Sequence, residues 1–146
     1  MSEESKVKSK WTTRRKLLVA FALLAGVFMV ATMPGLFWEL HEAYHSFHSF
    51  TDALIAKDYT RAYGSTAPEL RAVTDYNAFV KMHENWTSRM GDLRSVEVSH
   101  GEINDLGDGW WGNMNARMVF AHGSLFFTFI LKKENGSWKI YSYHEQ

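Results

Sequence analysis

The 146-residue sequence contains no cysteine and only two prolines, and its formal net charge at pH 7 is zero. Without cysteine the chain can form no disulfide, no catalytic thiolate and no zinc site with thiolate ligands. The lack of surplus positive charge argues against nucleic-acid binding, which needs a basic surface to displace counterions from phosphates. Any chemistry at a site must therefore come from histidine, carboxylate, hydroxyl or aromatic side chains, and no cofactor is predicted.

Charge is also missing from one long stretch of the chain. Residues 17–36 are twenty consecutive uncharged and mostly apolar residues. A helix rises about 1.5 Å per residue, so this length spans roughly 30 Å, the thickness of a bilayer's hydrocarbon core. The stretch therefore predicts a transmembrane helix, and Phe37 and Trp38 directly after it are typical interfacial aromatics.

The basic charge is concentrated in residues 1–16, where six lysines and arginines outnumber two glutamates. Positive residues beside a membrane span favour the cytoplasmic side. We therefore predict a cytoplasmic tail (1–16), one span of the inner or plasma membrane (17–36) and an extracytoplasmic, periplasmic domain (37–146). A cleaved signal peptide is the alternative, but the apolar run exceeds the usual length of about 7–15 residues, and no small-residue cleavage site follows it.

The first half of this outer domain has helical periodicity. Apolar residues recur every three or four positions over 38–56, which predicts an amphipathic helix. Further helical pieces are predicted over 59–63, over 69–73, and from Thr74 or Asp75 to about Ser88. Asp58 is the expected N-cap of the first of these, and Gly64 ends it. His83 falls in the apolar pattern of the last helix.

From Leu93 onwards the apolar period changes from about 3.6 to 2, which indicates strands. Strands are predicted from 93 onwards, over 111–121, over 125–132, and over 137–143, where Trp138, Ile140 and Ser142 alternate with Lys139, Tyr141 and Tyr143. Asn135-Gly136 is a strong hairpin signal because both residues tolerate the positive φ of a type I′ turn. Helices followed by strands predict an α+β domain, with helices on one face of a curved antiparallel sheet of about four strands.

Three segments resemble nuclear-transport-factor-2-like domains. Phe47–Tyr63 (FHSFTDALIAKDYTRAY) resembles their opening helix and its D-Y-x-x-A-Y continuation, and Glu69–Phe79 resembles their next segment. Leu125–Tyr143, which contains FFTFILKKENGSWKIYSY, is similar to their last hairpin. The resemblance covers 40–146 and implies a cone, formed by a bent sheet around a helix, with a pocket at its open end. It implies either a dehydratase or isomerase, or a binding and assembly domain without catalysis.

The order of tail, span and outer domain also resembles secretion-channel components of the VirB8 type. That likeness concerns the architecture alone, because this chain is much shorter and carries no specific motif of those proteins.

A histidine stripe on the first helix is the candidate metal site. His41, His45, His48 and Asp52 are four, three and four residues apart, which places them on one face. Imidazole and carboxylate ligands suit zinc, copper or nickel. Consecutive turns of one helix do not surround a tetrahedral ion, so a further ligand from elsewhere would be needed. The alternatives are a plain polar flank, or a contact surface that titrates near pH 6.5.

Acid/base chemistry in the cone has few candidates. Where the resemblance implies catalysis, an Asp and a His, or a Tyr and an Asp, work inside the cone as base and electrophilic donor. Asp52, Tyr63 and His100 are the candidates here, and none matches a family motif in position. His100 alternates in phase with Val96 and Val98, which predicts that it points inward as a hydrogen-bonded core histidine.

The chain is rich in aromatic residues that suit either a ligand pocket or a core. Candidate pocket residues are Tyr44, Tyr59, Trp111, Phe127 and Trp138. The run 125–130 is apolar on both faces, so its second face needs cover from helices, a second copy or a partner.

We therefore expect a membrane-anchored binding or assembly module of the cell envelope. It would bind a partner protein, a second copy through the sheet, or a small apolar ligand. A membrane-tethered lyase or isomerase with an acid/base pair in the cone is the alternative.

Overall fold

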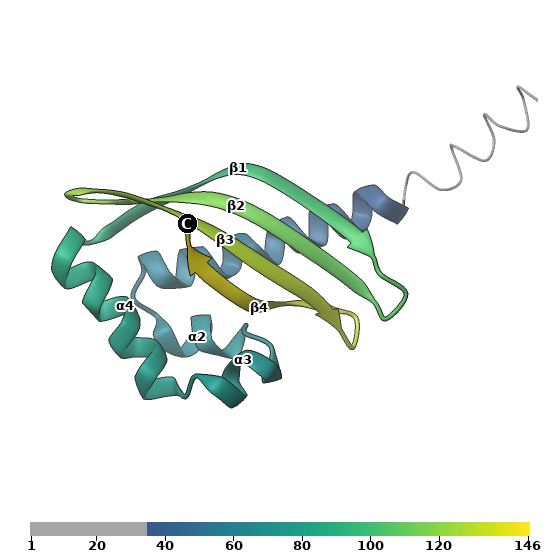
Figure 1. Cartoon of the computed structure of the whole chain (residues 1–146), viewed down its shortest axis with the longest axis horizontal. Helices are drawn as coiled ribbons and strands as arrows, with labels where there is room; N and C mark the ends of the chain where they lie inside the picture. The colour runs from purple at the N-terminus through teal and green to yellow at the C-terminus, as the bar shows by residue number, and fades with distance from the viewer. Residues whose placement is uncertain (1–34) are drawn as a thin grey trace, which may run out of the picture. The chain divides into compact units, whose positions relative to one another are not determined.

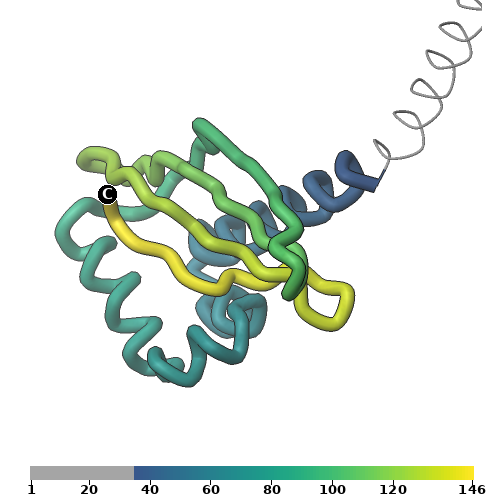
Figure 2. Tube along the Cα trace, turned by 45° about the vertical axis from the view of Figure 1, so that its right-hand side comes forward, coloured from purple at the N-terminus to yellow at the C-terminus, as the bar shows by residue number. Residues whose placement is uncertain are grey.

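The computed structural model of the chain describes residues 35–146, which form an α+β fold (Figures 1 and 2). A helix over residues 35–55 is followed by α2 (Tyr59–Gly64), α3 (Pro68–Val73), α4 (Tyr76–Met90), β1 (Leu93–Asp105), β2 (Trp110–Phe120), β3 (Gly123–Glu134) and β4 (Ser137–Glu145). The predicted basic tail, and the predicted span up to residue 34, lie outside the described residues. Within 35–146, no helix has both the length and the apolar character needed to cross a membrane.

The helix over residues 35–55 buries the apolar stripe that its periodicity predicts. Phe47, Phe50 and Leu54 are each 4% exposed or less. They share a face because positions three, four and seven apart align on a helix. Phe47 meets Phe129 of β3 edge-on, with ring centroids 5.0 Å apart, so the helix lies across the inner face of the sheet (Figure 1).

Capping residues set the ends of the shorter helices where the sequence predicts them. Asp58 accepts a hydrogen bond from the Arg61 N–H at 3.1 Å at the start of α2. Asp75 accepts one from the Ala78 N–H at 2.8 Å at the start of α4. Gly91 ends α4 with a φ of 77°, a left-handed value that glycine adopts without strain. The predicted helices are therefore confirmed, with bounds that differ by at most three residues.

The four strands form one antiparallel sheet in the order β1-β2-β3-β4. Its inner face carries alternate residues of β2, and Met114, Ala116 and Met118 are each 1% exposed or less. Phe129 and Phe127 of β3 pair with Met114 and Ala116. The predicted period of two and the predicted fold of helices on one sheet face are confirmed (Figure 1).

β1 departs from simple alternation. Its register shifts between Val98 and His100, so an extra residue of β1 is accommodated opposite β2. After this bulge Gly101 faces inward, against the side chains of Tyr44 and Met114. His100 consequently points to the outer face, with a side chain that is 62% exposed. The prediction that His100 points inward is therefore wrong, because the bulge reverses the phase of the strand.

Backbone contacts hold β4 at its start and at Ile140 on its free edge. Asn135 and Gly136 join it to β3 with φ values of 49° and 77°, as a type I′ turn requires. Along its free edge, the segment 65–67 forms a parallel bridge. The Ala67 N–H donates to the Ile140 carbonyl at 2.8 Å, and the Ile140 N–H donates to the Ser65 carbonyl at 3.2 Å. The segment 65–67 thereby covers the edge of the sheet at Ile140.

Candidate functional site

The interior between helices and sheet is occupied by aromatic side chains. The fully buried rings are those of Phe47, Phe50, Phe79, Phe127 and Phe129. Neighbouring rings pack tilted or edge-on, with centroids 5.0–6.4 Å apart. Aromatic pairs favour these arrangements over face-to-face sandwiches. The middle of the cone is therefore packed as a core.

One histidine lies among these rings. His83 of α4 is only 5% exposed. Its ring centroid is 4.5 Å from that of Phe79, 5.1 Å from that of Trp86, and 6.0 Å from that of Tyr59, on which it stacks. Its position follows from the sequence, because Phe79 and His83 are one helical turn apart on the apolar face of α4. His83 thus takes the place of the hydrogen-bonded core histidine predicted at His100.

His83 shares a hydrogen bond with the strand that closes the sheet. Its Nε2 lies 2.8 Å from the hydroxyl of Tyr143 on β4. Burial lowers the pKa of His83 to about 4 and raises the pKa of Tyr143, because the interior solvates neither charged form. Both groups are therefore neutral at physiological pH. A histidine of such low pKa is a weak base at neutral pH, and its ring nitrogen is already engaged by Tyr143.

Sequence reasoning places His83 on the correct face but does not pair it with Tyr143. The register of β4 shifts opposite Ile130 and Leu131, which leaves Tyr141 without a partner in the ladder. Strict alternation would put Ser142 on the inner face with the other buried residues of β4. The bulge turns Tyr143 inward instead, and no local sequence signal marks it.

The structure does not bring the three candidate catalytic residues together. Asp52 is exposed on the first helix. The Tyr63 hydroxyl donates a hydrogen bond to the Thr74 carbonyl at 2.9 Å. His100 lies on the outer face, where its Nε2 is 3.8 Å from Glu102 Oε2. These residues form no convergent acid/base set.

The five candidate pocket residues are also dispersed. Tyr59 and Phe127 lie in the interior, and Tyr44 of the first helix packs against β1. Trp138 lines a surface groove, whereas Trp111 lies on the outer face of the sheet. On that face the Trp111 ring packs edge-on against Tyr141 at 5.1 Å. These aromatic residues therefore do not line one common cavity.

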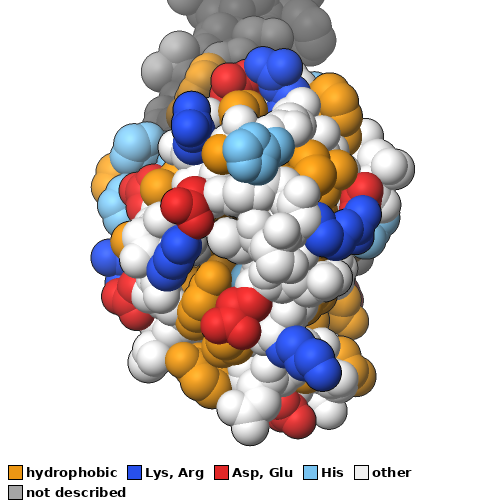
Figure 3. All heavy atoms as spheres, turned by 90° about the vertical axis from the view of Figure 1, so that its left-hand side faces the viewer, with side chains coloured by type: hydrophobic (Ala, Val, Ile, Leu, Met, Phe, Trp, Pro, Cys, Tyr) orange, Lys and Arg blue, Asp and Glu red, His pale blue; other side chains and the backbone are white. Residues whose placement is uncertain are grey.

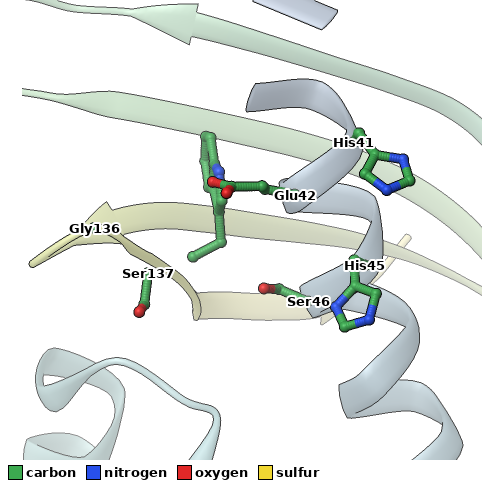
Figure 4. Close-up of a pocket in the computed structure, with 7 residues that line it drawn as sticks. His41, Glu42, His45, Ser46, Gly136 and Ser137 are labelled. Carbon is green, nitrogen blue, oxygen red and sulfur yellow. The ribbon is translucent and has the colours of Figure 1, made fainter. Parts of the chain in front are cut away.

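A groove of about 240 Å³ lies between the first helix and the β3–β4 hairpin (Figure 4). Its lining residues are His41, Glu42, His45, Ser46, Gly136, Ser137 and Trp138. Glu42 and Ser46 reach from the helix toward the hairpin, whereas the imidazoles of His41 and His45 turn to the other side of the helix (Figure 4). The groove thus offers mainly polar groups, with one tryptophan.

A cluster of charged side chains lies beside this groove. Lys133 is 16% exposed, and its Nζ lies 2.6 Å from Glu39 Oε2 and 3.0 Å from Glu42 Oε2. Burial opposes the charge on Lys133, but the hydrogen bonds to the two carboxylates outweigh it and raise its pKa. The indole N–H of Trp138 donates to Glu39 at 3.3 Å. Sequence reasoning missed this cluster because its members come from the first helix and the last hairpin.

The histidine stripe lies on the solvent side of the first helix. His41, His45, His48 and Asp52 are all exposed. Among residues 35–146, no three histidine, aspartate or glutamate side chains are arranged to hold a metal ion. The stripe fits the polar flank of an amphipathic helix, and its use as a pH-sensitive contact surface stays a prediction.

The outer face of the sheet is crossed by no helix of the described residues (Figure 1). The run 125–130 divides as its composition predicts, with Phe127 and Phe129 buried inside and Phe126 outside. The Phe126 side chain is 52% exposed. It lies opposite Arg117 of β2, which forms an ion pair with Glu97 of β1 at 2.6 Å.

Comparison with known proteins identifies the fold family. The family described as "SnoaL-like domain" matches residues 35–145. No curated protein is significantly similar to the chain. Among solved structures, the chain is similar to a SEC-C motif-containing protein from Rhodopseudomonas palustris, with 20% identity, a TM-score of 0.46, and coverage of 64% of this chain and 70% of that one.

The family match covers the whole described α+β fold and indicates a ligand-binding or isomerase-like module. The chain belongs to the SnoaL-like family, within the nuclear-transport-factor-2-like superfamily.

Proposed function

We propose that the chain is a single-pass membrane protein whose SnoaL-like domain binds a partner protein in the cell envelope and catalyses no reaction. One observation carries this proposal, namely the packed interior of the cone. Phe79, Phe127 and Phe129 occupy it with no exposed surface. The buried titratable pair there, His83 and Tyr143, is engaged in a mutual hydrogen bond of 2.8 Å.

The membrane anchoring is supported by the sequence. Residues 17–36 carry no charge and are long enough for one span, and residues 1–16 carry a net charge of +4. Basic residues beside a span favour the cytoplasm, so the domain would lie on the extracytoplasmic side. In a bacterium this is the periplasmic side of the inner membrane.

The contact surface we propose is the outer face of the sheet. It exposes Phe126 beside the Arg117–Glu97 ion pair, so an apolar ring lies next to charged groups. Aromatic residues with arginine nearby are enriched in protein interfaces. A second copy of the chain could dock there in the same way. A purely apolar small ligand is less well supported, because the groove beside the first helix is lined mainly by polar groups.

Photocrosslinking of the full chain in its native membrane tests this function. A photoreactive amino acid replaces Phe126 on the outer face, and a matched variant carries it at Lys81, an exposed position of α4. We expect crosslinked products from position 126 and few from position 81. The mass of the product distinguishes a second copy from another protein. Equal yields from both positions would contradict the outer face as the contact surface.

A lyase or isomerase is the second candidate, and the His83–Tyr143 pair is the observation that favours it. A substrate would have to reach His83, which is 5% exposed. Diethyl pyrocarbonate modification of the full chain, read by mass spectrometry, measures this access. The binding function predicts that His83 reacts far more slowly than the exposed His144, whereas an open catalytic pocket predicts similar rates.

A further inference from the structure

Two hairpin turns and the first helix meet at one end of the domain, which we call the hairpin end. Asp105 pairs with Trp110 around the β1–β2 turn, and Glu134 pairs with Ser137 around the β3–β4 turn. Because Trp111 pairs with Lys132, both turns lie at the same end of the sheet (Figure 2). The hairpin end therefore includes the turns at 106–109 and 135–136.

Glu39 of the first helix is held at the hairpin end. Its carboxylate accepts hydrogen bonds from Lys133 Nζ at 2.6 and 2.7 Å and from the Trp138 indole at 3.3 Å. Lys133 and Trp138 flank the β3–β4 turn. The start of the domain is thereby fixed beside this turn by side chains that are largely buried.

The distance from Glu39 to the predicted span is short. Only residues 37 and 38 separate Glu39 from the apolar stretch 17–36. Consecutive Cα atoms are about 3.8 Å apart, so Glu39 lies within roughly 11 Å of the end of that stretch. The opposite end, at the β2–β3 turn, is about 30 Å further along strands that rise roughly 3.3 Å per residue. A membrane anchor would therefore hold the hairpin end at the bilayer.

Leu106 is exposed at this end. It lies at the tip of the β1–β2 turn with 66% of its surface exposed. The turn is closed by a hydrogen bond from the Leu106 N–H to the Gly109 carbonyl at 3.1 Å. The neighbouring carboxylates bond within the hairpin, since Asp105 accepts from the Gly107 N–H at 2.9 Å and Asp108 from the Trp111 indole at 3.0 Å. A large apolar side chain thus projects from a turn whose acidic groups are engaged.

Among the residues that the structure describes, the surface at the opposite end of the domain shows no concentration of apolar side chains (Figure 3). Viewed from the side of α4 and the β2–β3 turn, acidic, basic and apolar side chains are interspersed (Figure 3). We infer that Leu106 contacts the surface of the lipid bilayer in which the chain is anchored. The hairpin end of the domain would then face the bilayer. This inference rests on the proposed membrane anchoring and adds an orientation and a second lipid contact.

The absence of cysteine allows a direct test in the full chain. Leu106→Cys carries an environment-sensitive fluorophore, and His122→Cys, at an exposed position of the β2–β3 turn, is the matched control. Both proteins are reconstituted into phosphatidylcholine vesicles that contain a spin-labelled phosphatidylcholine quencher. We expect the label at position 106 to emit at shorter wavelength and to be quenched at least about twofold more strongly than the label at 122.

The outcomes separate the orientation from the anchoring. If the protein floats with the vesicles, equal quenching at the two positions, or stronger quenching at position 122, would overturn the proposed orientation but not the anchoring. A blue shift at 106 without lipid quenching would also overturn it, because the residue would then contact protein. Failure of either labelled protein to float with vesicles would overturn the proposed anchoring itself. Matching thermal melting curves of both labelled proteins and the unmodified chain establish that the fold is retained.

Discussion

Acidification should destabilise this domain through its buried histidine. In the folded protein burial lowers the pKa of His83 to about 4, whereas its ordinary value is 6.5. Between these values the unfolded chain binds a proton that the folded protein does not. The free energy of unfolding therefore falls as the pH decreases from 6.5 to about 4. Above pH 6.5 His83 is neutral in both states and does not lower the free energy of unfolding. Below about pH 4 it is protonated in both states, and further acidification causes no additional loss of stability through this residue.

The size of the effect follows from the pKa difference. A change from 6.5 to about 4 corresponds to about 3 kcal/mol, at about 1.36 kcal/mol per pKa unit. Small domains have total stabilities of about 5–15 kcal/mol, so this single protonation is a sizeable fraction. Solvent screens little of it, because His83 is only 5% exposed.

Replacing His83 by glutamine isolates this contribution. The Gln side chain can still accept a hydrogen bond from the Tyr143 hydroxyl, but it does not titrate. Urea unfolding of the full chain in detergent micelles, followed by tryptophan fluorescence, gives the free energy of unfolding at each pH. Between about pH 8 and about pH 4.5 the free energy of unfolding of the wild type should fall by about 2–3 kcal/mol more than that of His83→Gln.

The control is His144→Gln, which removes an exposed imidazole next to Tyr143 in sequence. It should keep the acid dependence of the wild type. If His83→Gln lost stability in acid as steeply as the wild type, the burial of a neutral imidazole would not be the cause, and the reasoning would be refuted.

Three further pairs of substitutions test the packing and the local signals, all by urea or thermal unfolding. Phe129→Ala should lower the free energy of unfolding by about 3–5 kcal/mol because the ring is fully buried. Phe126→Ala should lower it by about 0.5 kcal/mol or less, because that ring is exposed. Similar losses from both substitutions would contradict the assignment of Phe129 to the inner face and Phe126 to the outer face. Asp75→Ala should lower the free energy of unfolding by about 1 kcal/mol because the N-cap hydrogen bond is lost. Asp75→Asn should retain most of this stabilisation, because an amide oxygen can also accept that hydrogen bond. Gly101→Ala should lower the melting temperature because a Cβ would meet the Tyr44 hydroxyl, and adding Tyr44→Phe should restore part of it; no recovery would place the strain elsewhere.

The helices and turns of this domain can be predicted from the sequence because their signals are local. The apolar spacing of Phe47, Phe50 and Leu54 orients the first helix without knowledge of its partner strand. Asp58 caps α2 through the Arg61 N–H three residues later. Such contacts form within one or two turns of chain, so a short stretch of sequence contains all the information they need.

Local signals in the sequence do not predict how the residues of the candidate site are arranged. His100 follows the alternation of Val96 and Val98, yet a bulge in β1 turns it to the outer face. Tyr143 reaches the interior through a second bulge, in β4. Each bulge depends on the register that a strand takes against its neighbour, and that register is set by the packing of the whole sheet.

The sequence by itself determined the α+β class, the helix ends, the β3–β4 turn and the length of the apolar stretch 17–36. Only the tertiary structure decided that His83 bonds to Tyr143, 60 residues away, and that Lys133 joins Glu39 at the hairpin end. The physical reason is that a dihedral preference or an apolar period acts over a few residues. A hydrogen bond between distant elements depends on how all the surfaces between them pack.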